Sequence, residues 1–264
     1  MTFKPALLVV DLQEDFCPPA SSAPSFPCTP PIQLHDTPTG SLAVPDARAI
    51  TAPVSRLLSL PFPLKLATRD WHPPSHISFA PNHHHQNAPP SSSEGEEAAP
   101  HPPPFTSTAT VTHPSDPSLT YETTLWPVHC VADTPGAQLV QDPHLNLAAR
   151  VDGIIDKGRD PRVEMYSAFY DPFRVEDSGL AARLRDARVT HVYVVGLAAD
   201  FCVRATAEHA AEEGYTAYIV EEGTRPVMPD KWPACRDELV AKGVKMVSID
   251  GDEVKRVAQL DTAK

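Results

Sequence analysis

The sequence predicts an α/β fold, a three-layer doubly wound arrangement in which a mainly parallel six-stranded sheet carries helices on both faces. Two observations lead to this prediction. Six short aliphatic runs alternate along the chain with four helical patterns. The runs are continuously apolar rather than alternately apolar and polar, which is typical of parallel strands buried on both sides.

The predicted strands are short runs rich in Val, Ile and Leu. They cover Ala6–Val10, Leu64–Thr68, Ile154–Asp156, His191–Val195, Ala217–Val220 and Lys245–Ile249. Helical periodicity is clearest over Arg48–Leu60, Leu180–Ala187, Val203–Glu213 and Trp232–Lys242. Because these elements alternate from one end of the chain to the other, we expect a single domain over residues 1–264.

Proline is concentrated in two stretches, at about 18–45 and 82–118, out of 31 prolines in the chain. The second stretch contains APPSSSEGEEAAPHPPP, which is polar and poor in aliphatic residues. Such a segment buries too little apolar surface to offset the entropy lost on ordering. We therefore expect both stretches to be surface insertions without regular structure.

Charge and cysteine content narrow the function classes. The 264 residues carry a net charge of −12, which argues against a nucleic-acid groove or an anionic membrane surface as partner. No apolar run is long enough to span a bilayer, and the N-terminus lacks the features of a signal peptide. The five cysteines form no C-x-x-C pair, so we predict reduced thiols. We expect a cytoplasmic protein, present in the nucleus or peroxisome only by association, and leave a homo-oligomer open.

Polar side chains follow four of the predicted strands directly. Asp11 follows the first, Asp70 and His72 the second, Lys157 the third, and Cys202 the fourth. In open parallel sheets, ligands bind beyond the carboxyl ends of the strands. These residues are therefore the first candidates for a functional site.

Cys202 lies where a strand passes into a helix, in the segment GLAADFC. The first turn of a helix favours an anion, so a thiol there gains thiolate character, and the free amides nearby can hold an oxyanion. The alternative is a buried core cysteine, which is the usual fate of an intracellular thiol. Lys157 could equally be a solvated surface residue, and Asp11 a helix cap or loop brace. Taken together, the three provide a base, a cation and a nucleophile.

A metal site is predicted from a second set of residues. Asp70 and His72 are two apart on an extended segment and so point to the same side, and His129 could supply a third ligand. Three protein ligands plus water is the coordination of an open, functional site. Neighbouring His76 and the triple histidine at 83–85 complicate the count, and a hydrogen-bonded turn is the alternative for Asp70 and His72.

Several long blocks resemble the nicotinamidases, which belong to the isochorismatase-like superfamily of cysteine hydrolases. The resemblance covers the chain in order from Ala6 to about Pro226, interrupted by the proline-rich stretches. The matching blocks are VVDLQEDFCPPA, TRDWHPPSHISFA, LWPVHCVADTPGAQL, DKG, YSAFYD and VVGLAADFCVRATA. The WPVHC block separates nicotinamidases from the vinyl-ether hydrolases of the superfamily. The fold implied is the isochorismatase-like hydrolase fold.

The resemblance implies a role for each matching residue. The catalytic residues are Asp11, Lys157 and Cys202, and the oxyanion hole is formed by the backbone N–H groups of Ala198 and Cys202. The peptide bond between Leu197 and Ala198 is expected to be cis. Phe16, Trp126 and Tyr166 are expected to wall the substrate ring, and Asp70, His72 and His129 to bind a divalent metal ion, with zinc as the first choice.

The implied reaction is the hydrolysis of nicotinamide to nicotinate and ammonia through a cysteine thioester, in NAD salvage, with pyrazinamidase activity beside it. Two alternatives remain at this point. A relative acting on another small amide, such as pyrazinamide or a carbamoyl compound, would keep the three catalytic residues but could lack the metal ligands. A catalytically silent metal-binding or scaffolding protein would have lost at least one catalytic position.

Overall fold

The computed structural model describes residues 2–17, 41–83 and 101–260. Its main sheet has six parallel strands in the order β5-β2-β1-β6-β7-β8. The strands are β1 (Pro5–Val10), β2 (Leu64–Asp70), β5 (Gly153–Lys157), β6 (His191–Leu197), β7 (Thr216–Arg225) and β8 (Lys245–Val247). The predicted six-stranded parallel sheet is confirmed.

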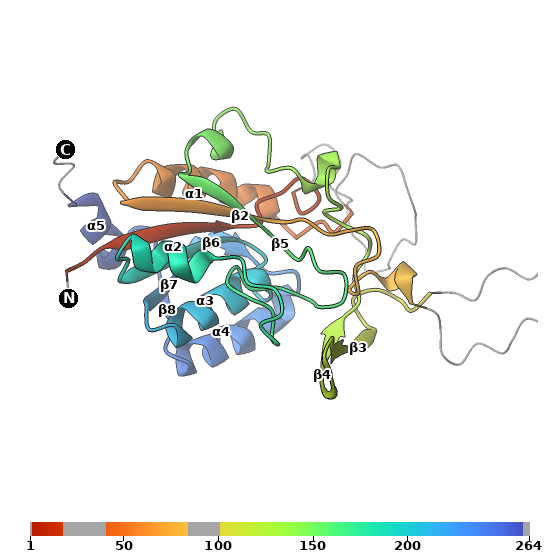
Figure 1. Cartoon of the computed structure of the whole chain (residues 1–264). Coiled ribbons are helices and arrows are strands. Elements are labelled where there is room, and N and C mark those ends of the chain that lie inside the picture. The colour runs from red at the N-terminus through yellow and green to blue at the C-terminus, as the bar shows by residue number, and fades with distance from the viewer. Residues whose placement is uncertain (1, 18–40, 84–100, 261–264) are drawn as a thin grey trace, which may run out of the picture.

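Helices cover both faces of this sheet, as the prediction required (Figure 1). One face carries α1 (Thr51–Leu58) and α5 (Asp252–Ala258). The other carries α2 (Leu180–Asp186), α3 (Cys202–Glu212) and α4 (Trp232–Ala241). The sequence pattern did not predict α5, which is short and buries only its two valines. Within the described ranges, no helix combines the length and apolar character needed to cross a bilayer.

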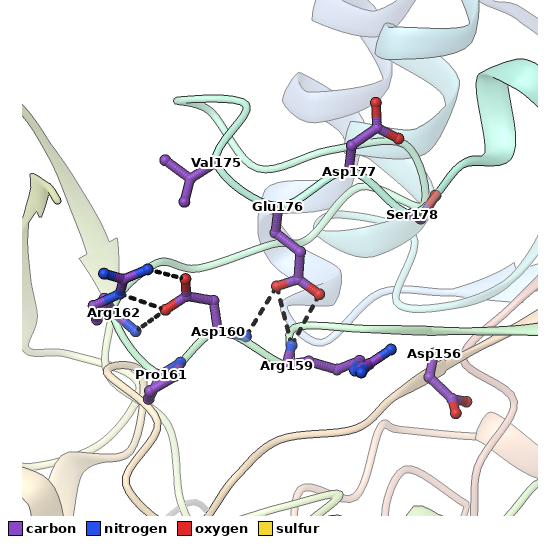
Figure 2. Close-up of a pocket in the computed structure, with 9 residues that line it drawn as sticks. All are labelled: Asp156, Arg159, Asp160, Pro161, Arg162, Val175, Glu176, Asp177 and Ser178. Atoms are coloured by element: carbon purple, nitrogen blue, oxygen red, sulfur yellow. Dashed lines mark hydrogen bonds and ion pairs between the residues drawn. The ribbon is translucent and has the colours of Figure 1, made fainter. Parts of the chain in front are cut away.

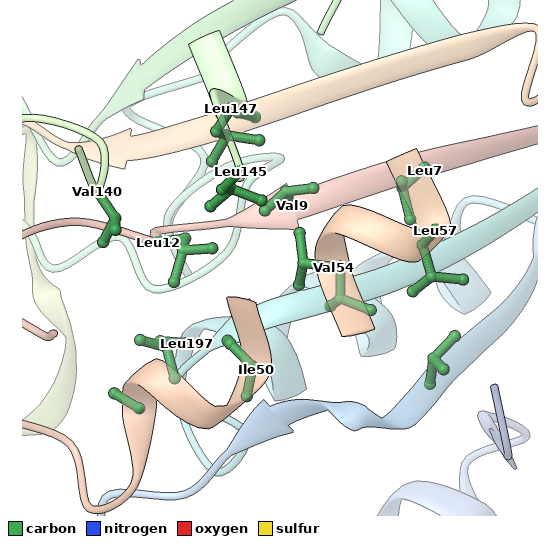
Figure 3. Packing of buried hydrophobic residues seen from close by; sticks show 14 of the residues in the cluster. Leu7, Val9, Leu12, Ile50, Val54, Leu57, Val140, Leu145, Leu147 and Leu197 are labelled. Carbon is green, nitrogen blue, oxygen red and sulfur yellow. The ribbon is translucent and has the colours of Figure 1, made fainter. Parts of the chain in front are cut away.

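The central strand β1 is buried along its whole length, and its side chains alternate between two hydrophobic clusters. Leu7 and Val9 face the cluster that contains Val54 and Leu57 of α1, which Figure 3 shows from close by. The intervening residues of β1 pack against the helices of the opposite face. This burial on both sides explains why the run is continuously apolar, and it anchors the strand end that carries Asp11.

Four strands extend further toward their carboxyl ends than predicted, whereas β8 ends at Val247 and not at the predicted Ile249. β2 runs through Asp70, β5 through Lys157, β6 through Leu197 and β7 through Arg225. The apolar pattern stops at the first polar side chain, but the backbone ladder continues, and Asp70 pairs in register with Lys157. Two candidate site residues are therefore held by the sheet itself and not by loops.

A β-hairpin begins inside the second predicted insertion, at about 82–118, and extends past its end. It consists of β3 (Thr108–His113) and β4 (Asp116–Thr124), which pair antiparallel and project from the main body (Figure 1). We did not expect regular structure in this insertion, because its sequence is polar, proline-rich and poor in aliphatic residues. Residues 84–100 of this insertion, and 18–40 of the first, lie outside the described part of the chain.

Candidate active site

The candidate residues meet at the carboxyl edge of the sheet, where the strand order changes direction around β1. Asp11 follows β1, Asp70 and Lys157 end β2 and β5, and Cys202 opens α3 after β6. Beside them lies a pocket lined by Phe16, Leu42, Asp70, His72, Trp126, His129, Glu164, Tyr166, Ala198, Phe201, Cys202 and Val227. This is the position at which open parallel sheets bind ligands.

Lys157 occupies the centre of the charged cluster. Its Nζ lies 2.6 Å from Asp70 Oδ1, 3.0 Å from Asp11 Oδ2 and 3.6 Å from Cys202 Sγ, and the side chain is fully buried. Burial acts to lower the pKa of Lys157, but the charges of Asp11 and Asp70 outweigh it, so the net pKa is raised well above its ordinary value. The ammonium is therefore charged at neutral pH and compensates two buried carboxylates.

Asp11 lies within reach of both the cation and the sulfur. One of its carboxylate oxygens is within 4.8 Å of Cys202 Sγ, and Thr68 Oγ1 donates a 2.6 Å hydrogen bond to Oδ1. Burial, assisted by the nearby charge of Asp70, raises the pKa of Asp11 to about 6, although Lys157 and Thr68 act to lower it. The carboxylate is thus ionised at neutral pH and basic enough to accept a proton.

Cys202 is the first residue of α3, and its thiol is almost completely buried. Burial raises the pKa of Cys202 well above its ordinary value, even though the Lys157 ammonium acts to lower it. The expectation of a depressed thiol pKa is therefore wrong for the polypeptide alone, because desolvation outweighs the lysine and the helix end. The sulfur holds its proton and needs a neighbouring base to become a nucleophile.

Two backbone N–H groups beside the sulfur are available to bind an anion. Those of Ala198 and Cys202 donate to no acceptor within the described residues. The Leu197–Ala198 peptide bond is cis, as the resemblance implies. Gly196, with a φ of +110°, lies so close to the Val10 backbone that a Cβ atom there would collide with it. The end of β6, which leads into these amides, therefore requires glycine at position 196.

Asp70, His72 and His129 form a second cluster next to the first. One ligand atom from each lies within 4.8 Å of the others, and all three side chains are buried. The Nδ1 atoms of His72 and His129 each lie 2.8 Å from a backbone carbonyl oxygen, of Gly158 and Pro127 respectively, so their Nε2 atoms remain as possible ligands, and His72 Nε2 lies 3.7 Å from Asp70 Oδ2. Burial lowers the pKa of both histidines. Neutral imidazoles oriented by carbonyl groups, together with a carboxylate, suit a divalent transition metal.

Gly158 connects the two clusters through the backbone. It follows Lys157 directly, has a φ of +67°, and its carbonyl oxygen accepts the hydrogen bond from His72. A Cβ atom at this position would collide with the His72 ring. Glycine is therefore required both by the left-handed backbone and by the approach of the histidine.

Aromatic side chains form the remaining wall of the pocket. Trp126 Nε1 donates a 3.0 Å hydrogen bond to the Tyr166 hydroxyl, and the Phe16 ring centroid lies 5.6 Å from that of His129. Phe201, which we did not predict, packs edge-on against Trp126 at 4.8 Å and contacts Tyr166 at 5.4 Å. Phe201 directly precedes Cys202 in the sequence, and this position beside the predicted nucleophile could have identified it.

Two further buried polar residues were missed. Glu164 lines the pocket, and burial raises its pKa to about 8. His76 packs on His72 with ring centroids 4.0 Å apart, and its Nε2 has no hydrogen-bond partner within the described residues. We had noted His76 only as a complication of the histidine count. Of the triple histidine, His83 donates a 2.6 Å hydrogen bond from Nε2 to the Ile77 carbonyl oxygen, while residues 84 and 85 lie outside the described part of the chain.

A separate, open hollow of about 550 Å³ lies beside the loop that leaves β5 (Figure 2). Several of its charged groups have protein partners. The Glu176 carboxylate accepts hydrogen bonds from the backbone N–H groups of Arg159 and Asp160, and Asp160 pairs with Arg162. These contacts hold the loop between Lys157 and Glu164 in place. None of the predicted site residues lines the hollow.

Comparison with known proteins agrees with this geometry. The isochorismatase domain family matches residues 97–250, more than half of the chain. A nicotinamidase of Saccharomyces cerevisiae is 34% identical over 246 residues, which cover 91% of this chain and 98% of that protein.

Solved structures give the same result. The yeast nicotinamidase bound to the inhibitor nicotinaldehyde has a TM-score of 0.73 at 33% identity, covering 92% of this chain and 99% of the other. The pyrazinamidase of Pyrococcus horikoshii in complex with zinc has a TM-score of 0.60 at 29% identity, covering 93% and 99%. The chain belongs to the isochorismatase-domain family and, within it, to the nicotinamidases.

Proposed function

We propose that this protein hydrolyses nicotinamide to nicotinate and ammonia, with Cys202 as nucleophile, Asp11 as proton carrier and Lys157 as the cation between them. The observation that carries the proposal is the buried cluster in which one lysine lies 3.0 Å from Asp11 and 3.6 Å from the Cys202 sulfur. The nicotinamidases among its relatives supply the substrate. The M. tuberculosis relative is named nicotinamidase/pyrazinamidase, so we include pyrazinamide as a second substrate.

The first half of the reaction forms a thioester. The Asp11 carboxylate takes the thiol proton of Cys202, and the sulfur attacks the carboxamide carbon. The tetrahedral oxyanion is bound by the backbone N–H groups of Ala198 and Cys202, and the loss of one such donor typically costs about 3 kcal/mol in transition-state stabilisation. Asp11 then gives its proton to the departing amine, which leaves as ammonia.

The second half reverses these roles. Asp11, again a carboxylate, takes a proton from water, and the resulting hydroxide attacks the thioester carbon. The same two N–H groups bind the second oxyanion, and its collapse releases nicotinate and returns the proton to sulfur. Throughout, the Lys157 ammonium holds Asp11 and Asp70 apart and compensates for negative charge near the sulfur.

We propose that Asp70, His72 and His129 hold a divalent metal ion, with zinc as the first choice. When bound, such an ion acts as a Lewis acid that accepts the lone pair of a pyridine nitrogen and so orients the ring. The chain contributes the two bare Nε2 atoms, and the aromatic wall of Phe16, Trp126 and Tyr166 excludes water from the ring. A cytoplasmic enzyme without nucleic-acid or membrane partners completes the proposal.

Ammonia release from nicotinamide by the purified protein tests the function. We expect steady turnover, and a loss of about 10⁴-fold or more in kcat for Cys202→Ala. Cys235→Ala is the matched control, because that thiol lies on α4 beside Arg204, and it should retain wild-type turnover. Turnover by Cys202→Ala at the wild-type rate would refute the assignment of the nucleophile.

Chelation tests the metal assignment separately. Treatment with a strong chelator should abolish ammonia release and lower the melting temperature, since the bound ion stabilises only the folded state. Added zinc should restore both. If the chelated protein keeps its melting temperature and its turnover, the three residues form only a hydrogen-bonded cluster.

A further inference from the structure

The β3–β4 hairpin lies beside the pocket and contacts one short segment of its wall. In a strand, alternate residues point to opposite faces. Tyr121 and Thr123 of β4 therefore share the face that also presents Val111, which is fully buried, while Thr110 and Glu122 point to solvent. The inner face of the hairpin is thus packed on the body of the protein.

Tyr121 makes two hydrogen bonds to a single residue of the wall. Its hydroxyl donates to the Glu164 carbonyl oxygen at 3.1 Å and accepts from the Glu164 backbone N–H at 2.8 Å. The ring packs against Phe173 with centroids 4.8 Å apart, which fixes its direction. One side chain therefore satisfies both backbone groups of a buried residue that belongs to no helix or strand.

The clamped segment contacts one residue of the proposed reaction and lines the pocket with another. The Met165 carbonyl oxygen accepts a 3.1 Å hydrogen bond from Lys157 Nζ, and Tyr166 lines the pocket. Thr123, two residues along β4 from Tyr121, lies 3.2 Å from the Tyr166 hydroxyl through its Oγ1. The hairpin thus holds the segment at Glu164 and again at Tyr166.

The opposite end of the same loop is held independently. There the Glu176 carboxylate accepts the N–H groups of Arg159 and Asp160 (Figure 2). Between this attachment and Tyr166, the segment is also held at the Pro161 carbonyl oxygen by the Ile77 N–H and at the Met165 carbonyl oxygen by Lys157 of β5. The backbone N–H and C=O groups of Glu164 bond to the hairpin through Tyr121, and without its hydroxyl both of these buried groups would lose that partner.

We propose that the β3–β4 hairpin positions the pocket wall for substrate: Tyr121 clamps the Glu164 backbone, and Thr123 orients the Tyr166 ring. Tyr121 is a positioning residue that touches neither substrate nor the reacting atoms. The inference rests on the proposed function, because it assigns Tyr166 to the wall that binds the pyridine ring. The β3–β4 hairpin, which follows a proline-rich stretch, is then part of the structure that binds substrate.

Kinetics of the full-length Tyr121→Phe variant test the proposal. We expect KM for nicotinamide to rise about three- to tenfold, the range that one or two hydrogen bonds support, with kcat changed less than about twofold. A merely structural role would reduce the active fraction, lowering kcat and leaving KM unchanged. Thr110→Val is the matched control, since it removes a cross-strand hydrogen bond to Glu122 on the exposed face of the same hairpin.

Thr123→Val provides a second test if Tyr121→Phe does not fold. It should also raise KM, and this increase should vanish in a Tyr166→Phe background, because the partner hydroxyl is then absent. Equal KM values for wild type and both hairpin variants would overturn the proposal. A lower kcat at constant KM would overturn it as well.

Hydrogen exchange separates this inference from the proposed function. The amides of residues 163–167 should exchange at least about tenfold faster in Tyr121→Phe than in wild type. In Thr110→Val their exchange rates should equal those of wild type. Faster exchange in a protein that releases no ammonia from nicotinamide would refute the function and leave the clamp standing. Unchanged exchange in an active protein would refute the clamp alone.

Discussion

Two ion pairs near the end of β5 have the same length and opposite surroundings. The Lys157 ammonium lies 2.6 Å from Asp70 Oδ1, and both side chains are buried. The Arg162 guanidinium also lies 2.6 Å from its partner, Asp160 Oδ2, but its side chain is 61% exposed at the open hollow of Figure 2. Distance alone therefore does not distinguish the two pairs.

Burial determines what each pair can do. In water, the attraction between charges is weak and the groups keep their ordinary chemistry. In the interior, removing one partner leaves an uncompensated charge, and the same desolvation moves pKa values into the range useful for proton transfer. Changing the buried pair is therefore expected to affect both the stability of the fold and the pKa of the neighbouring Asp11, whereas changing the exposed pair is expected to affect neither.

The largest expected effect comes from breaking the buried pair. Lys157→Met leaves Asp11 and Asp70 buried without their cation, so we expect kcat to fall by at least about 10³-fold and unfolding free energy by about 3–5 kcal/mol. Arg162→Met, the matched change in the exposed pair, should leave kcat and the melting temperature within error of wild type. Equal losses in the two variants would show that burial is not the deciding difference.

An intermediate effect is expected from acid. Asp11 must be a carboxylate to accept the thiol proton, and its pKa is raised to about 6, so kcat/KM should fall about tenfold for each pH unit below about 6. Thr68→Val removes a hydrogen bond that lowers this pKa, and it should move the acid limb to higher pH. The limb should not move in Arg162→Met. If the acid limb of the kcat/KM profile has the same midpoint in Thr68→Val as in wild type, Asp11 is not the group that produces it.

The smallest effect is expected at the open hollow. Glu176→Gln keeps an acceptor for the N–H groups of Arg159 and Asp160 but removes its charge, which should lower stability by about 1 kcal/mol. Activity should stay within about twofold of wild type, because the clamp at Tyr121 still holds the far end of the loop. Denaturant unfolding and ammonia release measure the two quantities. A loss of activity comparable to that of Lys157→Met would mean that the hollow, too, is part of the catalytic structure.

Sequence alone predicted the sheet and the location of the charged cluster. A continuous apolar run that ends in an acid, a lysine or a cysteine is a local signal, and the topology of a parallel sheet brings such ends together without further information. Asp11, Lys157 and Cys202 each carry this signal. Four of the strand ends were predicted too short, since backbone pairing continues past the apolar run, and the end of β8 was predicted two residues too far along the chain.

The pocket wall could not be predicted in the same way. Tyr121 belongs to a hairpin hidden in proline-rich sequence, and its value comes from contact with a backbone more than forty positions away. His76 and Glu164 approach the cluster of Asp70, His72 and His129 only because of how two loops fold, and neither follows a strand directly. The expectation of no regular structure in residues 82–118 came from composition, which averages over the residues that form β3 and the first residues of β4.

Gly158 has no side chain and yet joins two functions. Its carbonyl oxygen orients His72, and its peptide nitrogen is bonded to Lys157. Any other residue would be strained by the positive φ, and its Cβ atom would collide with the His72 ring. In a saturation mutagenesis experiment scored by growth on nicotinamide, position 158 should tolerate as few replacements as the nucleophile. A position that tolerates few replacements although it contributes no reactive group would then mark a peptide unit shared by the cluster around Lys157 and the cluster around His72.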